Sequence, residues 1–196
     1  MKARCFLIAA MILLSQFYSY FIGLNFQEVI HEQFQDLDKQ TAFSGLFFAI
    51  TNGASIFAQF LLTPFLLSRI SISTIHFLIP SINFLCMLGL WFSPGLYAAS
   101  AAFLIFKVME YSIFRAAKEI LYIPFSFDVR FRAKELIDVL GHRSGQGIAS
   151  FLYRWMQKVF FLGTAHIPYL TTGILALWFL VLIPLRRREL RHPKVT

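Results

Sequence analysis

Two residues of opposite charge, Lys107 and Glu110, lie within an otherwise apolar segment. A charged side chain at membrane depth costs roughly 2.5–3.5 kcal/mol on insertion scales, so such residues usually face a cavity or a partner. Three positions apart on a helix, an ammonium and a carboxylate can pair and offset the cost of their burial. The spacing therefore has two interpretations: a purely structural ion pair, or part of a passage for a polar molecule.

Further polar side chains recur at helical spacing in three apolar segments, which would place each set on one helix face. The sets are Asn52, Ser55, Gln59 and Thr63; Lys107, Glu110, Tyr111 and Lys118, flanked by Arg115; and Gln146, Ser150, Tyr153 and Gln157, bordered by Arg154 and Lys158. Such groups also join membrane helices, at about 0.6 kcal/mol per hydrogen bond. Because three stripes coincide with charges at membrane depth, we expect them to line a shared water-filled passage.

Arg154 lies deep in its apolar segment and is a good contact for an anion, because its guanidinium is always charged. Glu28 begins an acidic segment whose simpler interpretation is a solvated face. The predicted substrate-binding residues are Lys107, Glu110, Tyr111, Arg154, Glu28, Asn52, Gln59 and Gln146. In this hypothesis the two buried cations attract negative charge, and one of the two acidic residues orders a gate.

The elements that must position these residues are six apolar runs, each near the ~20 residues needed to cross a bilayer. They span residues 6–24, 43–67, 74–92, 96–114, 145–163 and 167–185, with a cytoplasmic loop at 115–143 and a basic cytoplasmic tail at 186–196. The composition is 58% hydrophobic, 17% aromatic and 14% charged, with a mean hydropathy of +0.65. These values predict an all-α membrane protein with a single six-helix domain over residues 1–196.

Lys and Arg residues are concentrated at one set of helix ends. The positive-inside rule therefore places both termini in the cytoplasm and predicts a multi-pass protein of the inner or plasma membrane. The net charge of +8 comes from the ends of apolar runs rather than from a soluble basic face, so we expect no nucleic-acid partner. The first run could instead be a signal peptide, but it is long and no small-residue cleavage site closes it.

Patterns typical of enzymes do not occur in the sequence. It has no Ser/His/Asp set, no Gly-rich phosphate loop and no ligand-spaced histidines, and Cys5 and Cys86 lie in apolar segments without metal-ligand spacing. We therefore expect no enzymatic activity, no cofactor and no bound metal.

The charged segment also carries a specific order of residues. The first motif is Lys-x-x-x-Tyr-Ser-x-Phe, at Lys107, Tyr111, Ser112 and Phe114. The second is Lys-Glu-x-x-Tyr-Ile-Pro, at Lys118, Glu119, Tyr122, Ile123 and Pro124. Further matching residues are Asn25–Val29 before these motifs and Ala133, Lys134, Ile137, Asp138 and Val139 after them. In this order the chain resembles the ATP/ADP translocases, nucleotide transport proteins of plastids and intracellular bacteria in the major facilitator superfamily, over roughly residues 15–160. The resemblance implies helices seven to twelve of a twelve-helix ATP:ADP antiporter that binds ATP.

Three positions depart from that family's pattern. Residues 31–34 read His-Glu-Gln-Phe where transporting members resemble Trp-Lys-Ser-Lys, Gln146 stands for the lysine of Gly-Lys-Ser-Gly, and Arg115 stands for an aspartate. A polyphosphate needs several fixed cations to replace its counter-ions. Because some of these cations are missing here, the resemblance implies transport of a nucleotide or another organic anion rather than ATP/ADP exchange in particular.

A major facilitator transporter binds its substrate between two six-helix halves. The expected partners are thus the lipid bilayer, a nucleotide or organic anion substrate, and a second six-helix half or a second copy of this chain. Polar stripes exposed to lipid would stay unsatisfied, which also indicates a covering partner. The alternative function is a non-transporting membrane protein, a truncated or regulatory remnant of the family, which the departing residues favour.

Overall fold

A computed structural model describes residues 2–123, 125, 127, 134–135, 144–161 and 166–190. Its elements are α1 (Lys2–Gln33), α2 (Leu37–Phe57), the π-helical turn η1 (Ala58–Leu62), α3 (Thr63–Arg69), α4 (Ile72–Phe92), α5 (Leu96–Met109), the π-helical turn η2 (Glu110–Phe114), α6 (Arg115–Leu121), α8 (Ser144–Phe160) and α9 (Ile167–Leu190). No strand occurs among these described residues. The predicted all-α membrane fold class is confirmed.

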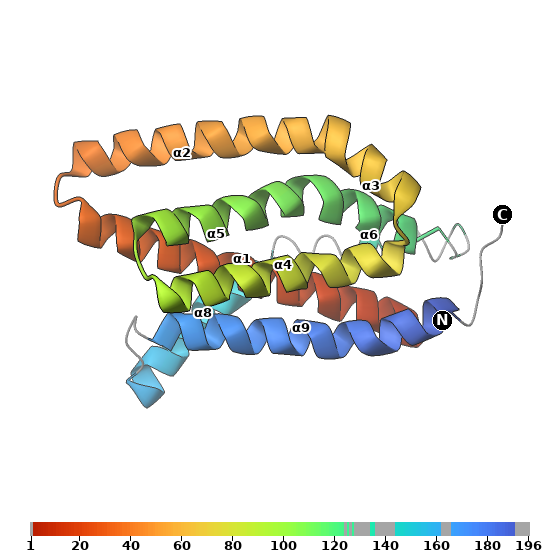
Figure 1. Ribbon diagram of the computed structural model, residues 1–196. Coiled ribbons are helices and arrows are strands. Elements are labelled where there is room, and N and C mark those ends of the chain that lie inside the picture. Colours follow the sequence, from red (N-terminus) through yellow and green to blue (C-terminus); the bar gives the residue numbers. More distant parts are fainter. Residues whose placement is uncertain are drawn as a thin grey trace.

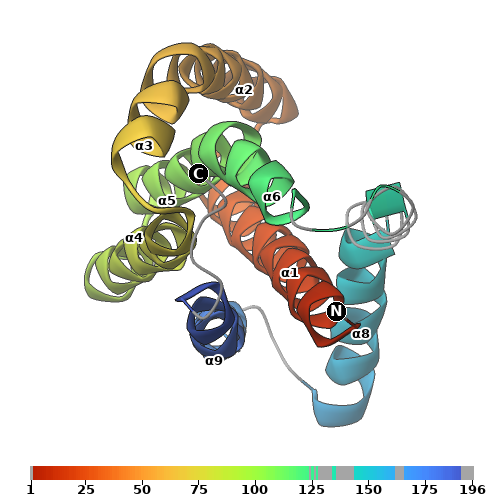
Figure 2. The same ribbon diagram turned by 90° about the vertical axis from the view of Figure 1, so that its right-hand side faces the viewer.

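The helices run side by side, and α1 begins at the same end of the bundle at which α9 finishes (Figure 1). α1 packs against α9, α5 and α8, and α4 packs against α9 and α5. α2 contacts the bundle mainly through α5. Viewed along the helices, α2 and α8 lie on different sides of the bundle, with α5 and α1 between them (Figure 2). α1 and α5 are therefore the helices that can place side chains between these two flanks.

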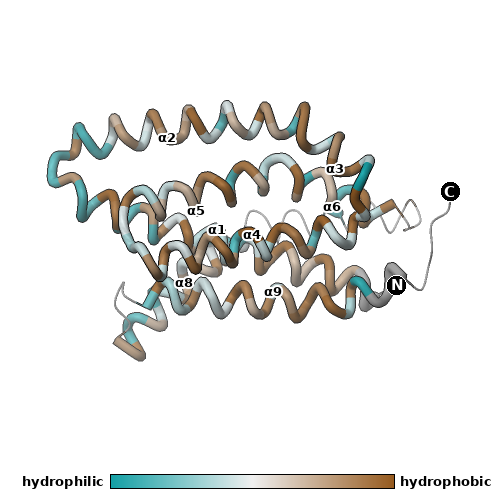
Figure 3. The backbone as a smooth tube through the Cα atoms, in the orientation of Figure 1, coloured by the Kyte–Doolittle hydropathy of each residue, from teal (hydrophilic) through white to brown (hydrophobic). Residues whose placement is uncertain are grey.

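In the described part of the chain, five helices are long and apolar enough to cross a membrane, namely Cys5–Gln33, Leu37–Arg69, Ile72–Phe92, Leu96–Leu121 and Ile167–Arg186. They correspond to five of the six predicted spans, and hydrophilic residues gather at the turn between α1 and α2 (Figure 3). The remaining predicted span corresponds to α8, which has 17 residues. α8 belongs to the stretch of chain that returns from the end of α6 to the start of α9 at the opposite end of the bundle (Figure 1).

The predicted loop at 115–143 is wrong at its start, because Arg115–Leu121 forms α6 and extends the fourth membrane helix. Ala117 and Leu121 are buried in the bundle, so continued helix hides apolar surface that a loop would leave exposed. Most of the predicted loop beyond residue 123 lies outside the described residues.

Both π turns occur inside membrane helices, and they pack against each other. Thr63 follows η1, and its backbone N–H bonds to the carbonyl of Ala58, five residues back. Pro64 comes next and has no N–H to donate, which loosens the α-helical hydrogen bonding at this level. π turns of this kind are frequent at functional sites, and η2 begins at Glu110.

Aromatic side chains dominate the core between α1, α5 and α9. The Tyr18 ring lies 4.8 Å from the Phe106 ring and 6.4 Å from that of Trp178, centroid to centroid. All three side chains are almost completely buried. Large exposed apolar side chains lie on the outer faces of several helices, including Phe57 on α2, Phe92 on α4, Phe151 on α8 and Leu180 on α9. The bundle therefore has a tight inner core and an apolar outer surface that bilayer lipid or a partner can cover.

Candidate functional site

Five polar side chains from α1, α5, η2 and α8 meet in the middle of the bundle, and we call them the polar cluster. The Lys107 ammonium donates one hydrogen bond to Glu110 Oε2 and another to Ser19 Oγ, each 2.8 Å long. Gln16 Nε2 donates to Glu110 Oε1 at 2.9 Å. Gln146 Nε2 lies 3.4 Å from Gln16 Oε1 and 3.3 Å from Ser19 Oγ. Side chains far apart in the sequence thus form one hydrogen-bonded network.

The charged members of the polar cluster are shielded from solvent, whereas its member on α8 is exposed. Lys107 is 9% exposed and Glu110 5% exposed, whereas Gln146 is an exposed residue. Both carboxylate oxygens of Glu110 accept a hydrogen bond, which is the condition under which a buried ion pair is tolerated. The polar cluster is therefore neutral as a whole, and its positive charge is held by an internal carboxylate.

Three aromatic rings surround the Lys107 ammonium. Its Nζ lies 5.7 Å from the centroid of Phe103, 5.6 Å from that of Phe106 and 5.1 Å from that of Tyr111. Ring faces attract a cation within about 6 Å, most strongly where water is scarce. Tyr111 is 42% exposed, so its ring is the part of this aromatic cage that reaches the surface of the bundle.

A glycine brings α8 close enough to join the polar cluster. A Cβ added to Gly145 would lie 2.7 Å from Cβ of Gln16, closer than real Cβ contacts allow. Without a side chain at this position α8 can approach α1, and the next residue, Gln146, reaches Gln16 and Ser19. This use of glycine is typical of helix contacts in membranes.

The structure brings together four of the eight predicted site residues. Lys107, Glu110 and Gln146 belong to the polar cluster, and Tyr111 touches it through its ring. Arg154 is exposed on α8, eight residues and about 12 Å along the helix from Gln146. Within the described residues, its guanidinium forms no ion pair.

Glu28 lies apart from the polar cluster. It is half-buried on α1, twelve residues and about 18 Å along the helix from Gln16. Among the residues that the structure describes, its carboxylate forms neither an ion pair nor a hydrogen bond. Its gating role stays a prediction.

The predicted stripe on the second membrane helix divides into two kinds of residue. Ser55 and Thr63 are buried, and their hydroxyls donate to carbonyls of their own helix at 2.7 and 3.1 Å. Asn52 and Gln59 are exposed on the outside of the bundle. In the described part of the chain their amides make no hydrogen bond, so this stripe does not join the polar cluster.

Gln16 and Ser19 are the two members of the polar cluster that sequence reasoning missed. A signal was present, since Gln16, Ser19, Gly23 and Gln27 recur at intervals of three and four residues in an apolar helix. This spacing places small and polar residues on one face of α1. That face meets α5 and α8, the helices that carry Lys107 and Gln146.

The polar cluster can exchange one ion-pair or hydrogen-bond partner for another. Among the described residues, no group of three His, Cys, Asp or Glu side chains is placed to hold a metal ion. An ammonium shared by a carboxylate and a hydroxyl can instead change partners, because an external anion offers the same kind of charged acceptor.

Comparison with protein families gives one match. The sequence model of the TLC ATP/ADP transporter family matches residues 57–188, which include Lys107, Glu110, Gln146 and Arg154. Comparison with curated proteins and with solved structures finds no match.

Proposed function

Because the chain belongs to the TLC ATP/ADP transporter family, we propose that it is one half of a transporter that moves a nucleotide or another organic anion across a membrane. The observation that carries the proposal is the Lys107–Glu110 pair, held between three helices by Gln16, Ser19 and Gln146. A charge at this depth has a functional origin more often than not. The basic helix ends support the proposed orientation, with both termini in the cytoplasm.

In the proposed mechanism the substrate anion and Glu110 compete for Lys107. With no substrate bound, the carboxylate keeps the ammonium neutralised and the helices together. A phosphate or carboxylate group of the substrate replaces Glu110 at the ammonium, because it offers charged oxygen acceptors in the same place. When the substrate also displaces Ser19 from the ammonium, the Lys107–Ser19 link between α5 and α1 is broken. Substrate binding and helix movement are coupled in this way.

Arg154 supplies a second positive charge in the proposed mechanism. Its guanidinium is exposed on α8, the helix that Gln146 links to the polar cluster. An arginine without an ion-pair partner among the described residues can bind an anion, and a bidentate anion satisfies its guanidinium best. The exposed amides of Asn52 and Gln59 on the opposite flank need a partner. We propose that a second six-helix half, or a second copy of this chain, faces these side chains and completes the passage.

One observation favours the alternative, a membrane protein that does not transport. The Lys107 and Glu110 charges satisfy each other, and the pair needs no external ion for its stability. In that function the polar cluster would only hold helices together. The two proposals differ in what the loss of Lys107 does to transport.

Uptake of radiolabelled ATP into cells that express the chain, alone or with a candidate N-terminal half, tests the proposal. We expect Lys107→Gln to lower uptake at least tenfold at an equal amount of membrane-inserted protein, because a neutral amide cannot hold the anion. Lys39→Gln is the matched control, since Lys39 is an exposed lysine of α2. Uptake that is unchanged by Lys107→Gln, or absent for every nucleotide and organic anion in both settings, favours the non-transporting alternative.

A further inference from the structure

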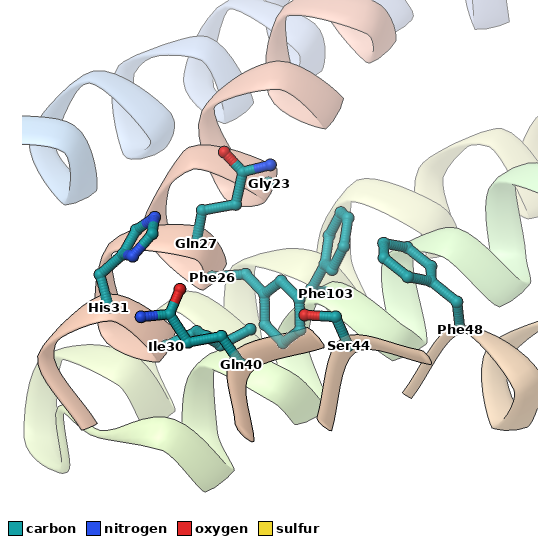
Figure 4. Close-up of a pocket in the computed structure, with 9 residues that line it drawn as sticks. All are labelled: Gly23, Phe26, Gln27, Ile30, His31, Gln40, Ser44, Phe48 and Phe103. Atoms are coloured by element: carbon teal, nitrogen blue, oxygen red, sulfur yellow. The ribbon is translucent and has the colours of Figure 1, made fainter. Parts of the chain in front are cut away.

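A cavity of 310 Å³ lies between the end of α1 and the start of α2, and no member of the polar cluster lines it; we call it the aromatic pocket. Its lining residues are Gly23, Phe26, Gln27, Ile30, His31, Gln40, Ser44, Phe48 and Phe103. Figure 4 shows the rings of Phe26, Phe48 and Phe103 on one side, and the side chains of His31 and Gln40 on the other. The volume is at the lower end of the range for small-molecule sites, about 300–1,000 Å³.

The lining residues suit an uncharged, planar ligand. They include no Asp, Glu, Lys or Arg. The Phe26 and Phe103 rings lie 4.9 Å apart and are buried against each other, whereas Phe48, 6.3 Å from Phe103, is 46% exposed and offers the ligand an open ring face. Flat heteroaromatic rings stack on such faces. A phosphate group would find no cation among these side chains except a histidine.

Polar atoms at the edge of the pocket are available for hydrogen bonds. The Gln40 amide donates to the carbonyl of Phe34 at 2.7 Å, which fixes the orientation of this side chain. Among the described residues, the side chains of Gln27, His31 and Ser44 make no hydrogen bond. Together they offer donors and acceptors at the rim of an aromatic surface, the arrangement that recognises the edge of a nucleobase.

The aromatic pocket borders the polar cluster on two helices. The Phe103 ring lines the pocket, and its centroid lies 5.7 Å from Lys107 Nζ. On α1, Gly23 lines the pocket four residues, about 6 Å, beyond Ser19, which accepts a hydrogen bond from Lys107. Lys107 is buried and is not a lining residue, but it lies directly behind the pocket wall that Gly23 and Phe103 form.

We propose that the aromatic pocket binds the purine base of the substrate, with the phosphate end directed along α1 and α5 toward Lys107. The base stacks on the exposed ring of Phe48, and Gln27 and Ser44 bond to its edge. The identification of the ligand as a nucleotide rests on the proposed function. Binding of the base is separable from transport, because the pocket takes the uncharged part of the molecule.

Photolabelling with 2-azidoadenosine, a nucleoside without phosphate, tests the pocket directly. The full chain is reconstituted in lipid nanodiscs, labelled across a range of probe concentrations, digested and mapped by mass spectrometry. We expect the label on residues 23–31, on residues 40–48 or on Phe103, and we expect excess adenosine to remove it while ribose 5-phosphate does not. A label elsewhere, or one that adenosine does not displace, overturns the proposal.

Two variants with matched controls identify the contacts. Ser44→Phe fills the pocket and should abolish labelling, whereas Ala42→Phe adds the same ring at an exposed position of α2 outside the lining. Gln27→Leu should weaken adenosine binding about tenfold, equivalent to about 1.4 kcal/mol, whereas Gln33→Leu removes an exposed amide of α1 outside the pocket. Equal labelling in Ser44→Phe and the wild-type chain refutes the site even if the protein transports ATP. Specific labelling without uptake of any nucleotide would support the pocket and contradict the proposed function.

Discussion

The polar cluster and the second membrane helix both carry polar residues at helical spacing, but they satisfy them differently. On α2 the hydroxyls of Thr51 and Ser55 donate to carbonyls four residues back, at 2.8 and 2.7 Å. In the polar cluster the longer side chains of Gln16 and Lys107 reach acceptors on other elements. A short side chain can be satisfied within its own helix, as the buried amide of Asn83 also is at the carbonyl of Ile79, whereas the longer glutamine and lysine reach beyond it. A polar stripe therefore indicates a helix contact only where it contains long side chains.

The polar stripe on the second membrane helix also contains two amide side chains. Asn52 and Gln59 are exposed and make no hydrogen bond in the part of the chain that the structure describes. Lipid cannot satisfy an amide. The polar cluster is thus complete within one bundle, whereas the α2 stripe is the kind of surface that the proposed second half would complete.

The largest loss of stability is expected from Glu110→Ala, because it leaves the buried Lys107 charge without its carboxylate. Removing one partner of a buried ion pair costs about 3–5 kcal/mol. Thermal unfolding in detergent measures the effect, with Glu32→Ala, an exposed acidic residue of α1, as the control. The double variant Lys107→Ala/Glu110→Ala should recover part of the loss. Equal stability of the Glu110→Ala and wild-type chains would show that the pair does not hold the bundle together.

A smaller loss is expected from Gln16→Leu, which removes the second hydrogen bond to Glu110. A hydrogen bond to a charged group contributes about 1.5–3 kcal/mol. Chemical denaturation followed by tryptophan fluorescence checks this, since the core contains the buried Trp178. Gln33→Leu, at the exposed end of the same helix, should change stability very little. If both variants behaved alike, the link between α1 and η2 would be unimportant.

Gly145→Ala should also separate α8 from the polar cluster. The added Cβ would lie 2.7 Å from Cβ of Gln16, and overpacking of this kind costs about 1–3 kcal/mol. Gly147→Ala is the control, because nothing lies within 4 Å of its Cβ and alanine favours helix. Cysteine cross-linking between α1 and α8 would report the separation. Cross-linking that is unaffected by Gly145→Ala would contradict the close approach.

The smallest effect is expected from Ser55→Ala on α2. The hydroxyl bonds to a carbonyl of its own helix, and that carbonyl belongs to the helical hydrogen-bond ladder, so we expect a change below about 0.6 kcal/mol. Thermal unfolding of the chain in detergent measures it, and Gln16→Leu serves as the contrasting variant. A loss as large as that of Gln16→Leu would mean that hydroxyl stripes also join helices in this protein.

Much of the fold was predictable because membrane helices are recognised by a local property. Apolar runs and the turns between them predicted the all-α class and five spans that the structure contains. The ends were less accurate, since α6 continues the fourth span to Leu121 where a loop was expected. Hydropathy falls at Arg115 and Lys118, but packing of the intervening residues keeps this segment helical.

The candidate site was predictable only where its members share one helix. The spacing of Lys107 and Glu110 predicted that they could pair, and their charged atoms lie 2.8 Å apart. Gln16 and Ser19 were missed, because their importance depends on a contact with residues about ninety positions away. The π turn at Glu110 was not predicted either, since it has no proline or other marker in its sequence.

By itself, the sequence determined that the chain is helical, which five segments are long and apolar enough to cross a membrane, and which family the chain belongs to. These follow from composition and periodicity, which are properties of one segment at a time. Only the tertiary structure decided that Gln16, Ser19 and Gln146 surround the ion pair while Asn52 and Gln59 face outward. Helix packing makes that choice, because the faces that meet depend on how close two backbones can approach, as Gly145 shows at Gln16.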